Sequence, residues 1–476
     1  IDATELASVS EKSSCLYSGT VEEMIQKEQL LNPDCLIGFS PEKAIPLLSK
    51  YAAAFQGLCT SDDPQFVYNF WEFPRITKAW RYLQTAAEQS GIVGGCSHVL
   101  CWEDGEGRYY RHAMALKKEG RLGGWKSGGK AWNKQGVAVN VTSNQFVNLY
   151  SGEFFDNTVA AIIPNDVRHL PAIFAFLSSD EYREAVRDIS QALSITEHTL
   201  LKVPFDLPYW QKVAKQNGQE SIPESHSTDP TQWQFQGAIP DSDLPLQAAV
   251  ARLLNYYWPG QPREPDGVSA FADKDGIVCI PAIRGEQPAA ERLEEVLHAA
   301  YGSKWSNSLL HTILAAVDAR PGTTLDDWLR NTFFEQHFKR FHNRPFVWHI
   351  WDGRKDGFSC LVNYHKLNHK ALENVTYSYL GDWIKVQAAD AKANKVGADL
   401  RLGAAQALQE KLKLILAGEP PYDIFVRWKP LSEQAIGWHP DLNDGVRMNI
   451  RPFVEAGILR KNPNIKWTKD RGKEPQ

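Results

Sequence analysis

The sequence predicts an α+β protein in which a mixed, β-rich region is followed by a mainly helical one. The β-rich region is indicated by short apolar runs between glycine-rich turns, at residues 98–102, 137–141 and 159–163. The second region is indicated by apolar residues at helical spacing, over residues 244–258, 289–301, 325–341 and 400–416. A polar stretch rich in Ser, Gln, Asp and Pro, residues 216–231, separates the two regions and is typical of a linker.

Three more helices are expected earlier in the chain. Residues 41–55 carry a mostly apolar face, and residues 170–176 and 181–189 keep helical spacing after Pro164 and Asp166. We therefore expect a helical linker over residues 1–54, a mixed α/β domain over residues 55–215, and a mainly helical domain with a basic tail over residues 232–476.

Length and composition bound the class of protein. A chain of 476 residues predicts two or three domains, and 43% apolar with 23% charged residues is ordinary for a soluble globular protein. The net charge of −5 gives no overall basic field, so any contact with nucleic acid must come from local Lys/Arg clusters. Seven cysteines, an odd number, suit a reducing cytoplasm better than a disulfide framework. Since no apolar run approaches the ~18 residues of a membrane span, we expect a cytoplasmic protein with no membrane partner.

Candidate metal and nuclease residues are sparse. Cys96, His98 and Cys101 lie close in sequence, but no second ligand pair follows at zinc-ribbon spacing. His342 and His349 resemble a metal-nuclease pair without the surrounding ββα pattern. We predict no metal site, and we interpret these side chains as structural.

The strongest binding signal lies between residues 108 and 134. This stretch holds eight basic residues against one acid, Glu119, and is interleaved with glycines and two tryptophans: Arg108, Arg111, Lys117, Lys118, Arg121, Lys126, Lys130, Lys134, Trp125 and Trp132. Lys and Arg neutralise phosphates, and glycine lets a backbone approach closely, so the composition suits a DNA-contacting loop. A solvated hairpin is an equally good interpretation.

Two other basic clusters carry less information. Residues 460–473 hold six basic residues against Asp470, which is typical of either a phosphate clamp or a solvated tail. Residues 337–344 are basic as well, and the aromatic-rich stretch that follows at residues 345–351 is expected to be core.

Several stretches resemble one protein family when they are compared as text. Residues 55–66, FQGLCTSDDPQF, resemble the Gly-x-x-Thr-Gly-x-Asn-x-x-Phe element that opens the target-recognition region of type IIG-like adenine methyltransferases, with Ser61 in place of the second Gly and Asp63 in place of the Asn. Further matches are GKAWNKQG (129–136), LYSGEFF (149–155), KVPFD (202–206), RPFVWHIWDG (344–353), DLNDGVRMNIRPF (441–453) and PNIKWTKDRGKE (463–474). Together they resemble the C-terminal half of the large methyltransferases of DISARM, and more distantly BREX, phage-defence systems.

The resemblance implies a function and a division of labour. In this family the N-terminal half carries the Rossmann-like domain for S-adenosyl-L-methionine and the catalytic Asn-Pro-Pro-aromatic motif, and the C-terminal half recognises and clamps DNA. The nearest run here, Glu419-Pro-Pro-Tyr422, starts with Glu and follows a helix-like stretch, so we interpret it as a connector. We therefore expect that the SAM-binding domain and the catalytic residues are absent from this chain. The complete enzyme would flip a target adenine and methylate its N6, which marks host DNA as self in restriction–modification.

The expected partners are double-stranded DNA, the catalytic half and other defence-system proteins. The expected DNA-binding residues are Lys126, Lys130, Trp132, Lys134, Gln135, Arg447, Asn449, Arg451, Lys466, Lys469 and Arg471. The basic residues would grip phosphates, while the amides of Gln135 and Asn449 would contact adenine edges or make structural hydrogen bonds. The alternative is a protein-interaction scaffold of a defence complex, which the acidic net charge and the sixteen tryptophans favour.

Overall fold

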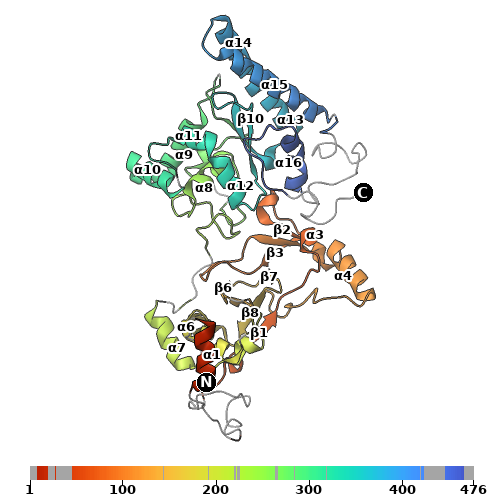
Figure 1. Ribbon diagram of the computed structural model, residues 1–476, viewed down its shortest axis with the longest axis vertical. Helices are drawn as coiled ribbons and strands as arrows, with labels where there is room; N and C mark the ends of the chain where they lie inside the picture. Colours follow the sequence, from red (N-terminus) through yellow and green to blue (C-terminus); the bar gives the residue numbers. More distant parts are fainter. Residues whose placement is uncertain are drawn as a thin grey trace. The chain divides into compact units, whose positions relative to one another are not determined.

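A computed structural model of the chain describes residues 8–19, 27, 45–142, 144–190, 192–218, 221, 226–262, 266–283, 285–317, 319–418, 420–422 and 445–465. The chain divides into two compact units. The first comprises Ile1–Gln56, Lys130–Gly152 and Thr158–Pro223, and the second comprises Gly57–Gly129, Glu153–Asn157 and Glu224–Gln476. Both units combine helices with a sheet, so the predicted α+β class is confirmed (Figure 1).

The first unit is built on a four-stranded antiparallel sheet in the order β1 (Ala52–Gln56), β8 (Val159–Pro164), β5 (Gly136–Asn140), β6 (Val147–Tyr150). All residues of β5 and β6 are buried, including the polar Asn140 and Asn148. The strands predicted near residues 137 and 159 are confirmed. Residues 41–44 of the helix predicted over residues 41–55 lie outside the described residues. The remainder is not an α-helix, because only Leu48–Lys50 form a short 3-10 turn and residues 52–56 pair with β8, which overrides the helical spacing.

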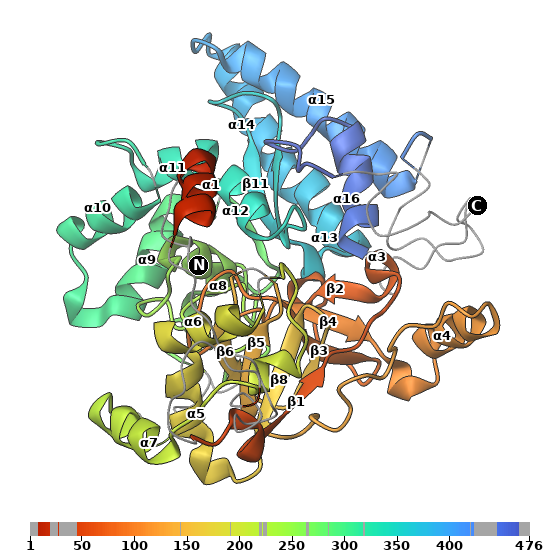
Figure 2. The same ribbon diagram turned by 60° about the horizontal axis from the view of Figure 1, so that its bottom comes forward.

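Helices cover this sheet. Helix α5 (Leu170–Leu177) packs on the sheet, and α6 (Asp180–Ile189) and α7 (Leu207–Gln216) pack on α5. Helix α1 (Val9–Ser18) has no buried residue. Helix α5 is buried along its whole length between the sheet and α7 (Figure 2). Ser179 and Asp206 cap α6 and α7 by accepting hydrogen bonds from Tyr182 N and Tyr209 N. The helices predicted over residues 170–176 and 181–189 are thus confirmed.

The second unit begins with a sheet in the order β2 (Val67–Asn69), β4 (His98–Cys101), β3 (Trp80–Gln84), β7 (Phe154–Phe155). Its pairs are antiparallel except β3 with β7, which is parallel. The strand predicted over residues 98–102 is confirmed. The short helix α3 (Asp63–Phe66) leads into β2.

The turn before α3 contains Ser61, which stands where the family element has its second glycine. Ser61 has φ = +61°, a left-handed conformation that glycine adopts without steric cost. Thr60 Oγ1 hydrogen-bonds to Asp63 and accepts from Asp62 N, so the turn closes on its own side chains. Gly57 packs against the backbone of Phe155 and Asp156, and an added Cβ would be 2.0 Å from Asp156 O. The motif therefore keeps a tight turn although serine replaces one glycine.

The rest of the second unit is mainly helical around a second sheet. Its helices are α8 (Pro245–Leu253), α9 (Ala289–Tyr301), α10 (Asn307–Ala316), α11 (Leu325–Asn331), α12 (Phe333–Arg340), α13 (His369–Glu373), a π-helical stretch (Asn374–Tyr379), α14 (Leu380–Lys392), α15 (Ala398–Ala417) and α16 (Gly445–Glu455). The helix predicted over residues 289–301 has the same bounds, and that over residues 400–416 is confirmed by α15. The stretch 325–341 is two helices, which meet at Thr332. The stretch 244–258 is helical only to residue 253.

The second sheet was not predicted. It has the antiparallel order β10 (Val347–Trp351), β11 (Ser359–Asn363), β9 (Ile277–Cys279). Phe346, Val347 and Trp348 are buried, which confirms that the aromatic-rich stretch 345–351 is core. Trp71 is also fully buried, and its indole Nε1 donates to Arg344 O at 3.1 Å. Many of the tryptophans therefore serve packing.

The six cysteines that the structure describes are free thiols. Across the described part of the chain, no helix has the length and apolar character needed to cross a membrane.

Candidate nucleic-acid interface

The basic stretch that the sequence predicts as a loop is half helix. Residues 108–118 form α4 (Arg108–Lys118), and only residues 119–135 are turns. The helix forms because Tyr109, Ala113 and Leu116 recur at helical spacing and are buried. Lys117 and Lys118 lie in its last turn, where cations are favourable to the helix dipole. The prediction of one continuous loop or hairpin is therefore corrected.

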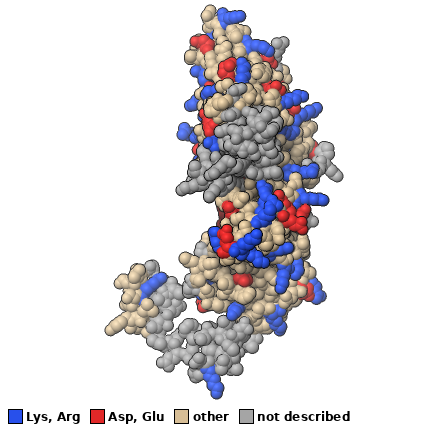
Figure 3. Space-filling model, turned by 90° about the vertical axis from the view of Figure 1, so that its right-hand side faces the viewer, with Lys and Arg blue, Asp and Glu red and all other residues tan. Residues whose placement is uncertain are grey.

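On the face that Figure 3 shows, exposed Lys and Arg side chains lie interspersed with Asp and Glu. Two of the eight basic residues pair with acids: Arg108 with Glu103 at 3.4 Å and Arg121 with Glu119 at 3.0 Å. The other six are exposed, and none has an acidic group within ion-pair distance among the described residues: Arg111, Lys117, Lys118, Lys126, Lys130 and Lys134. Cations without internal partners are available to bind phosphate oxygens.

Lys126 is positioned by an aromatic cluster in the second unit. Its Nζ lies 5.6 Å from the ring centroid of Trp125 and 6.0 Å from that of Trp102, within the range of cation–π attraction. The two indoles are stacked, with centroids 5.9 Å apart. Buried Tyr109 of α4 secures this turn, because its hydroxyl lies within hydrogen-bond distance of Cys59 O and Trp125 O, at 3.1 and 3.0 Å. Trp125 therefore orients the Lys126 ammonium group through a cation–π contact.

The remaining predicted loop residues belong to the first unit, just before β5. Asn133 turns the chain with φ = +62° and donates its N–H to Gly152 O at 2.8 Å. Trp132 is half-buried, whereas Lys130, Lys134 and Gln135 are exposed. The turn therefore exposes the side chains of Lys130, Lys134 and Gln135 to solvent, and the Asn133 hydrogen bond fixes its backbone.

The C-terminal candidates behave differently from the loop. Asn449 is 4% exposed, and its Nδ2 donates to the hydroxyl of Tyr364 at 3.2 Å, so its amide is not available at the surface. Arg451 is half-buried and pairs with Glu455 at 2.8 Å. Arg447 lies on α16, and Lys466, Lys469 and Arg471 lie outside the described residues.

The start of the predicted basic tail is packed against the second unit. The Arg460 guanidinium lies 4.3 Å from the ring of Trp351 and donates to Arg330 O at 2.8 Å. Lys461 forms an ion pair with Glu335. These two cations therefore hold the chain end in place, and phosphate contacts are not assigned to them.

The buried histidines His337 and His349 and the buried thiols of Cys96 and Cys101 are uncharged at pH 7. Burial lowers the pKa of both His337 and His349 to about 3, so both rings are neutral at pH 7. His337 Nε2 accepts from Val347 N at 3.1 Å, which is a packing role. Burial raises the pKa of Cys96 to about 12 and that of Cys101 to about 11, so these thiols stay protonated. Among the described residues, no three His, Cys, Asp or Glu side chains are grouped as metal ligands.

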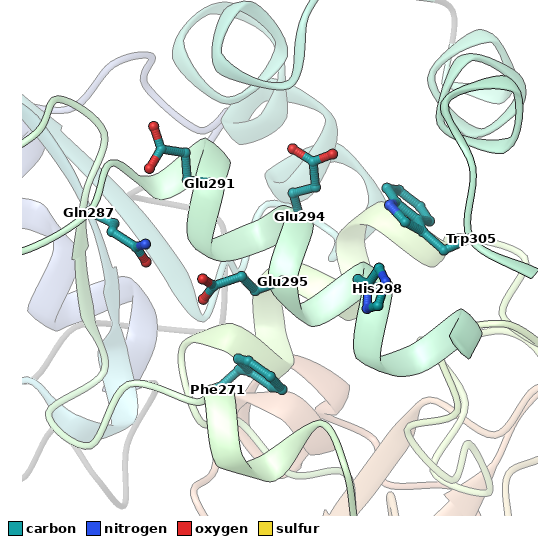
Figure 4. A pocket seen from close by; sticks show the side chains of 7 residues that line it. All are labelled: Phe271, Gln287, Glu291, Glu294, Glu295, His298 and Trp305. Atoms are coloured by element: carbon teal, nitrogen blue, oxygen red, sulfur yellow. The ribbon is translucent and has the colours of Figure 1, made fainter. Parts of the chain in front are cut away.

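An open pocket on α9 has the opposite charge to the α4 region. It encloses about 420 Å³ and is lined by Phe271, Gln287, Glu291, Glu294, Glu295, His298 and Trp305 (Figure 4). Three exposed carboxylates on one side of α9 would repel phosphate, so this part of the second unit is a poor site for DNA.

The Pro-Pro-Tyr run does not fit a methyl-transfer motif. Pro420, Pro421 and Tyr422 follow the C-cap Gly418 of α15, whereas such a tetrapeptide follows a buried strand. No residue is assigned to S-adenosylmethionine on this basis.

Comparison with known proteins gives one informative similarity. No protein-family model matches the chain. Over 194 residues, 38% of the chain, the sequence is 26% identical to a protein named adenine-specific methyltransferase BrxX from Escherichia coli O9:H4 (strain HS). The match supports a relationship to BREX-type methyltransferases. It spans 16% of the length of that relative. Placement in DISARM, and in the C-terminal half of such an enzyme, stays a prediction.

Proposed function

We propose that this chain is the DNA-recognition and DNA-clamping part of an S-adenosylmethionine-dependent adenine-N6 DNA methyltransferase that marks host DNA as self in a bacterial anti-phage system. The similarity to BrxX supports the methyltransferase part of the proposal. The DNA-binding part is carried by one observation: among the described residues, exposed cations lack acidic partners in each unit, four around α4 in the second unit and two in the turn before β5 in the first.

The proposed contacts follow from the chemistry of the exposed groups. Lys126, Lys130 and Lys134 neutralise backbone phosphates, which supplies affinity without sequence information. The exposed Gln135 amide makes no hydrogen bond to any residue that the structure describes, so its donor and acceptor can pair with adenine N7 and N6. Asn449 is left out of this interface because it is buried. S-adenosylmethionine, which supplies the methyl group, is bound in this proposal by a separate catalytic part.

The test is a fluorescence-anisotropy titration of the full chain with duplex DNA. The triple charge reversal Lys126→Glu, Lys130→Glu, Lys134→Glu is compared with Lys304→Glu, Lys370→Glu, Lys392→Glu, a control that changes the same charge at exposed lysines of the second unit. We expect the first variant to lose at least tenfold in affinity, about 1.4 kcal/mol, and the control to lose less than threefold.

Two results would contradict the proposal. One is equal loss in both variants, which would indicate a response to net charge alone. The other is an absence of binding by the folded chain at low salt, which would favour the alternative of a protein-interaction scaffold.

A further inference from the structure

A small aromatic pocket in the second unit is separate from the cationic residues described above. It encloses about 140 Å³ between the chain leading into β3 and the segment that follows α8. Six aromatic side chains contribute to its lining: Phe70, Phe73, Tyr82, Tyr256, Tyr257 and Trp258. A cavity of roughly 150 Å³ accommodates one benzene ring, so this pocket has room for a single six-membered ring.

The walls of the pocket are held by contacts outside it. Tyr256 stacks on Phe346 with ring centroids 4.0 Å apart, and Tyr82 stacks on Trp233 at 4.9 Å. Trp258 is 1% exposed, and its Nε1 donates to Pro230 O at 2.8 Å. The rings therefore do not need to rearrange to admit a ligand, and a preformed site loses less conformational entropy on binding.

Polar groups converge inside these walls. Tyr256 is 4% exposed, yet its hydroxyl makes no hydrogen bond to any residue that the structure describes. The same holds for the Tyr82 hydroxyl, which lies close enough to Tyr256 to raise its pKa. Burial raises the pKa of Tyr82 itself to about 12, so both hydroxyls are neutral at pH 7 and can donate as well as accept. Each hydroxyl keeps some contact with solvent, so it is free to pair with a polar ligand.

The surroundings of the pocket favour a ligand that carries phosphate. Arg75 also lines it, is exposed, and has no ion-pair partner among the described residues. No carboxylate is among the described lining residues, although Glu153 lies near enough to Tyr82 to raise its pKa. Aromatic faces, hydroxyls at a ring edge and a cation at the rim are the groups that bind a nucleobase with its attached phosphate.

We propose that this pocket binds one unstacked pyrimidine base of the DNA. The inference rests on the proposed function, because methylation of adenine N6 requires the adenine to leave the helix and leaves its thymine unpaired. The base stacks against the aromatic walls, the Tyr82 and Tyr256 hydroxyls pair with its edge, and Arg75 contacts the adjoining phosphate. The cavity volume of about 140 Å³ matches a single six-membered ring better than the fused rings of a purine.

The test compares the full chain with four DNA duplexes that differ at one position. They are a fully paired duplex and duplexes with a single bulged thymine, a bulged adenine or an abasic bulge. We expect about tenfold tighter binding to the thymine bulge than to the abasic bulge, from stacking on the aromatic walls and hydrogen bonds to the two tyrosine hydroxyls together. The variant Tyr82→Phe/Tyr256→Phe keeps the walls and should reduce that preference to less than threefold. Tyr209→Phe, at an exposed tyrosine of the first unit, should leave it unchanged.

Thymidine 5′-monophosphate separates this inference from the proposed function. Saturation-transfer NMR with this nucleotide does not require duplex binding by the chain. A signal that the double variant abolishes supports the pocket even if no duplex binds, in which case only the proposed function fails. If duplexes bind without preference for the thymine bulge and the nucleotide gives no signal, the pocket proposal is overturned. Equal preference for the adenine bulge overturns it as well.

Discussion

The salt dependence of DNA binding gives the sharpest quantitative prediction. Each phosphate that a cation neutralises adds about −0.9 to the slope of log K against log salt concentration for duplex DNA. If all six unpaired cations around α4 and the turn before β5 contact phosphates, the slope is about −5.4. Affinity should then fall about 2,000-fold between about 50 and 200 mM salt.

Neutralising part of the set predicts a defined change in that slope. The triple variant Lys126→Ala, Lys130→Ala, Lys134→Ala removes half of the six cations, so the slope should become about −2.7 and the loss over the same salt range about 40-fold. Anisotropy titrations at four salt concentrations measure both slopes. A wild-type slope near zero, or a variant slope equal to that of the wild type, would refute the assignment of these lysines to phosphates.

Three further predictions concern stability and the support of the interface. Ser61→Gly should raise the free energy of unfolding by about 1 kcal/mol, because it relieves a positive φ, and urea titration measures it. Tyr109→Phe removes the hydroxyl that ties the Trp125 turn to α4, and should speed amide exchange in that turn about tenfold, or about 1.4 kcal/mol. His337 and His349 have pKa values near 3 when folded, so below the unfolded value of 6.5 the unfolded chain binds more protons. Stability should therefore fall as pH drops from about 6.5 toward 3, by up to about 1.4 kcal/mol per pH unit for each ring.

Each of these predictions has a result that would contradict it. A lower urea midpoint for Ser61→Gly would mean that the serine side chain contributes more than its backbone conformation costs. Unchanged exchange in Tyr109→Phe would mean that packing alone holds the turn. His349→Phe keeps the size of a buried ring whose nitrogens have no hydrogen-bond partner among the described residues, and it should remove about half of the pH slope. An unchanged slope in this variant would show that other groups control the acid sensitivity.

The sequence was informative where one local signal dominated. Residues 289–301 were predicted with the observed bounds, because Leu293, Val296 and Leu297 recur on one buried face. The strand at residues 159–163 was predicted because it is an uninterrupted apolar run, as a strand buried on both faces requires. These elements depend little on distant parts of the chain.

Tertiary partners explain most of the errors. Residues 52–56 have helical apolar spacing, but pairing with β8 makes them a strand. The helix predicted over residues 325–341 is interrupted at Thr332. Next to it, the Arg460 guanidinium donates hydrogen bonds to the Arg330 carbonyl and to the Asn331 side-chain oxygen. Neither partner is visible in the local sequence.

The candidate site was only partly predictable. The excess of basic residues in this stretch predicted the lysines around α4 as a binding site. It gave no indication that residues 108–118 form a helix. The spacing of Tyr109, Ala113 and Leu116 was the signal that could have indicated it. The aromatic pocket could not be predicted, because Tyr82 and Tyr256 are far apart in the sequence and meet only in the fold.

Direct mapping of the DNA contact tests the central claim most closely. Lysine labelling of the full chain, followed by mass spectrometry with and without duplex DNA at low salt, reports which amines the DNA covers. The account predicts protection of Lys126, Lys130 and Lys134, and no protection of the exposed control lysines at positions 304, 370 and 392. Equal labelling of both sets with DNA bound would contradict it.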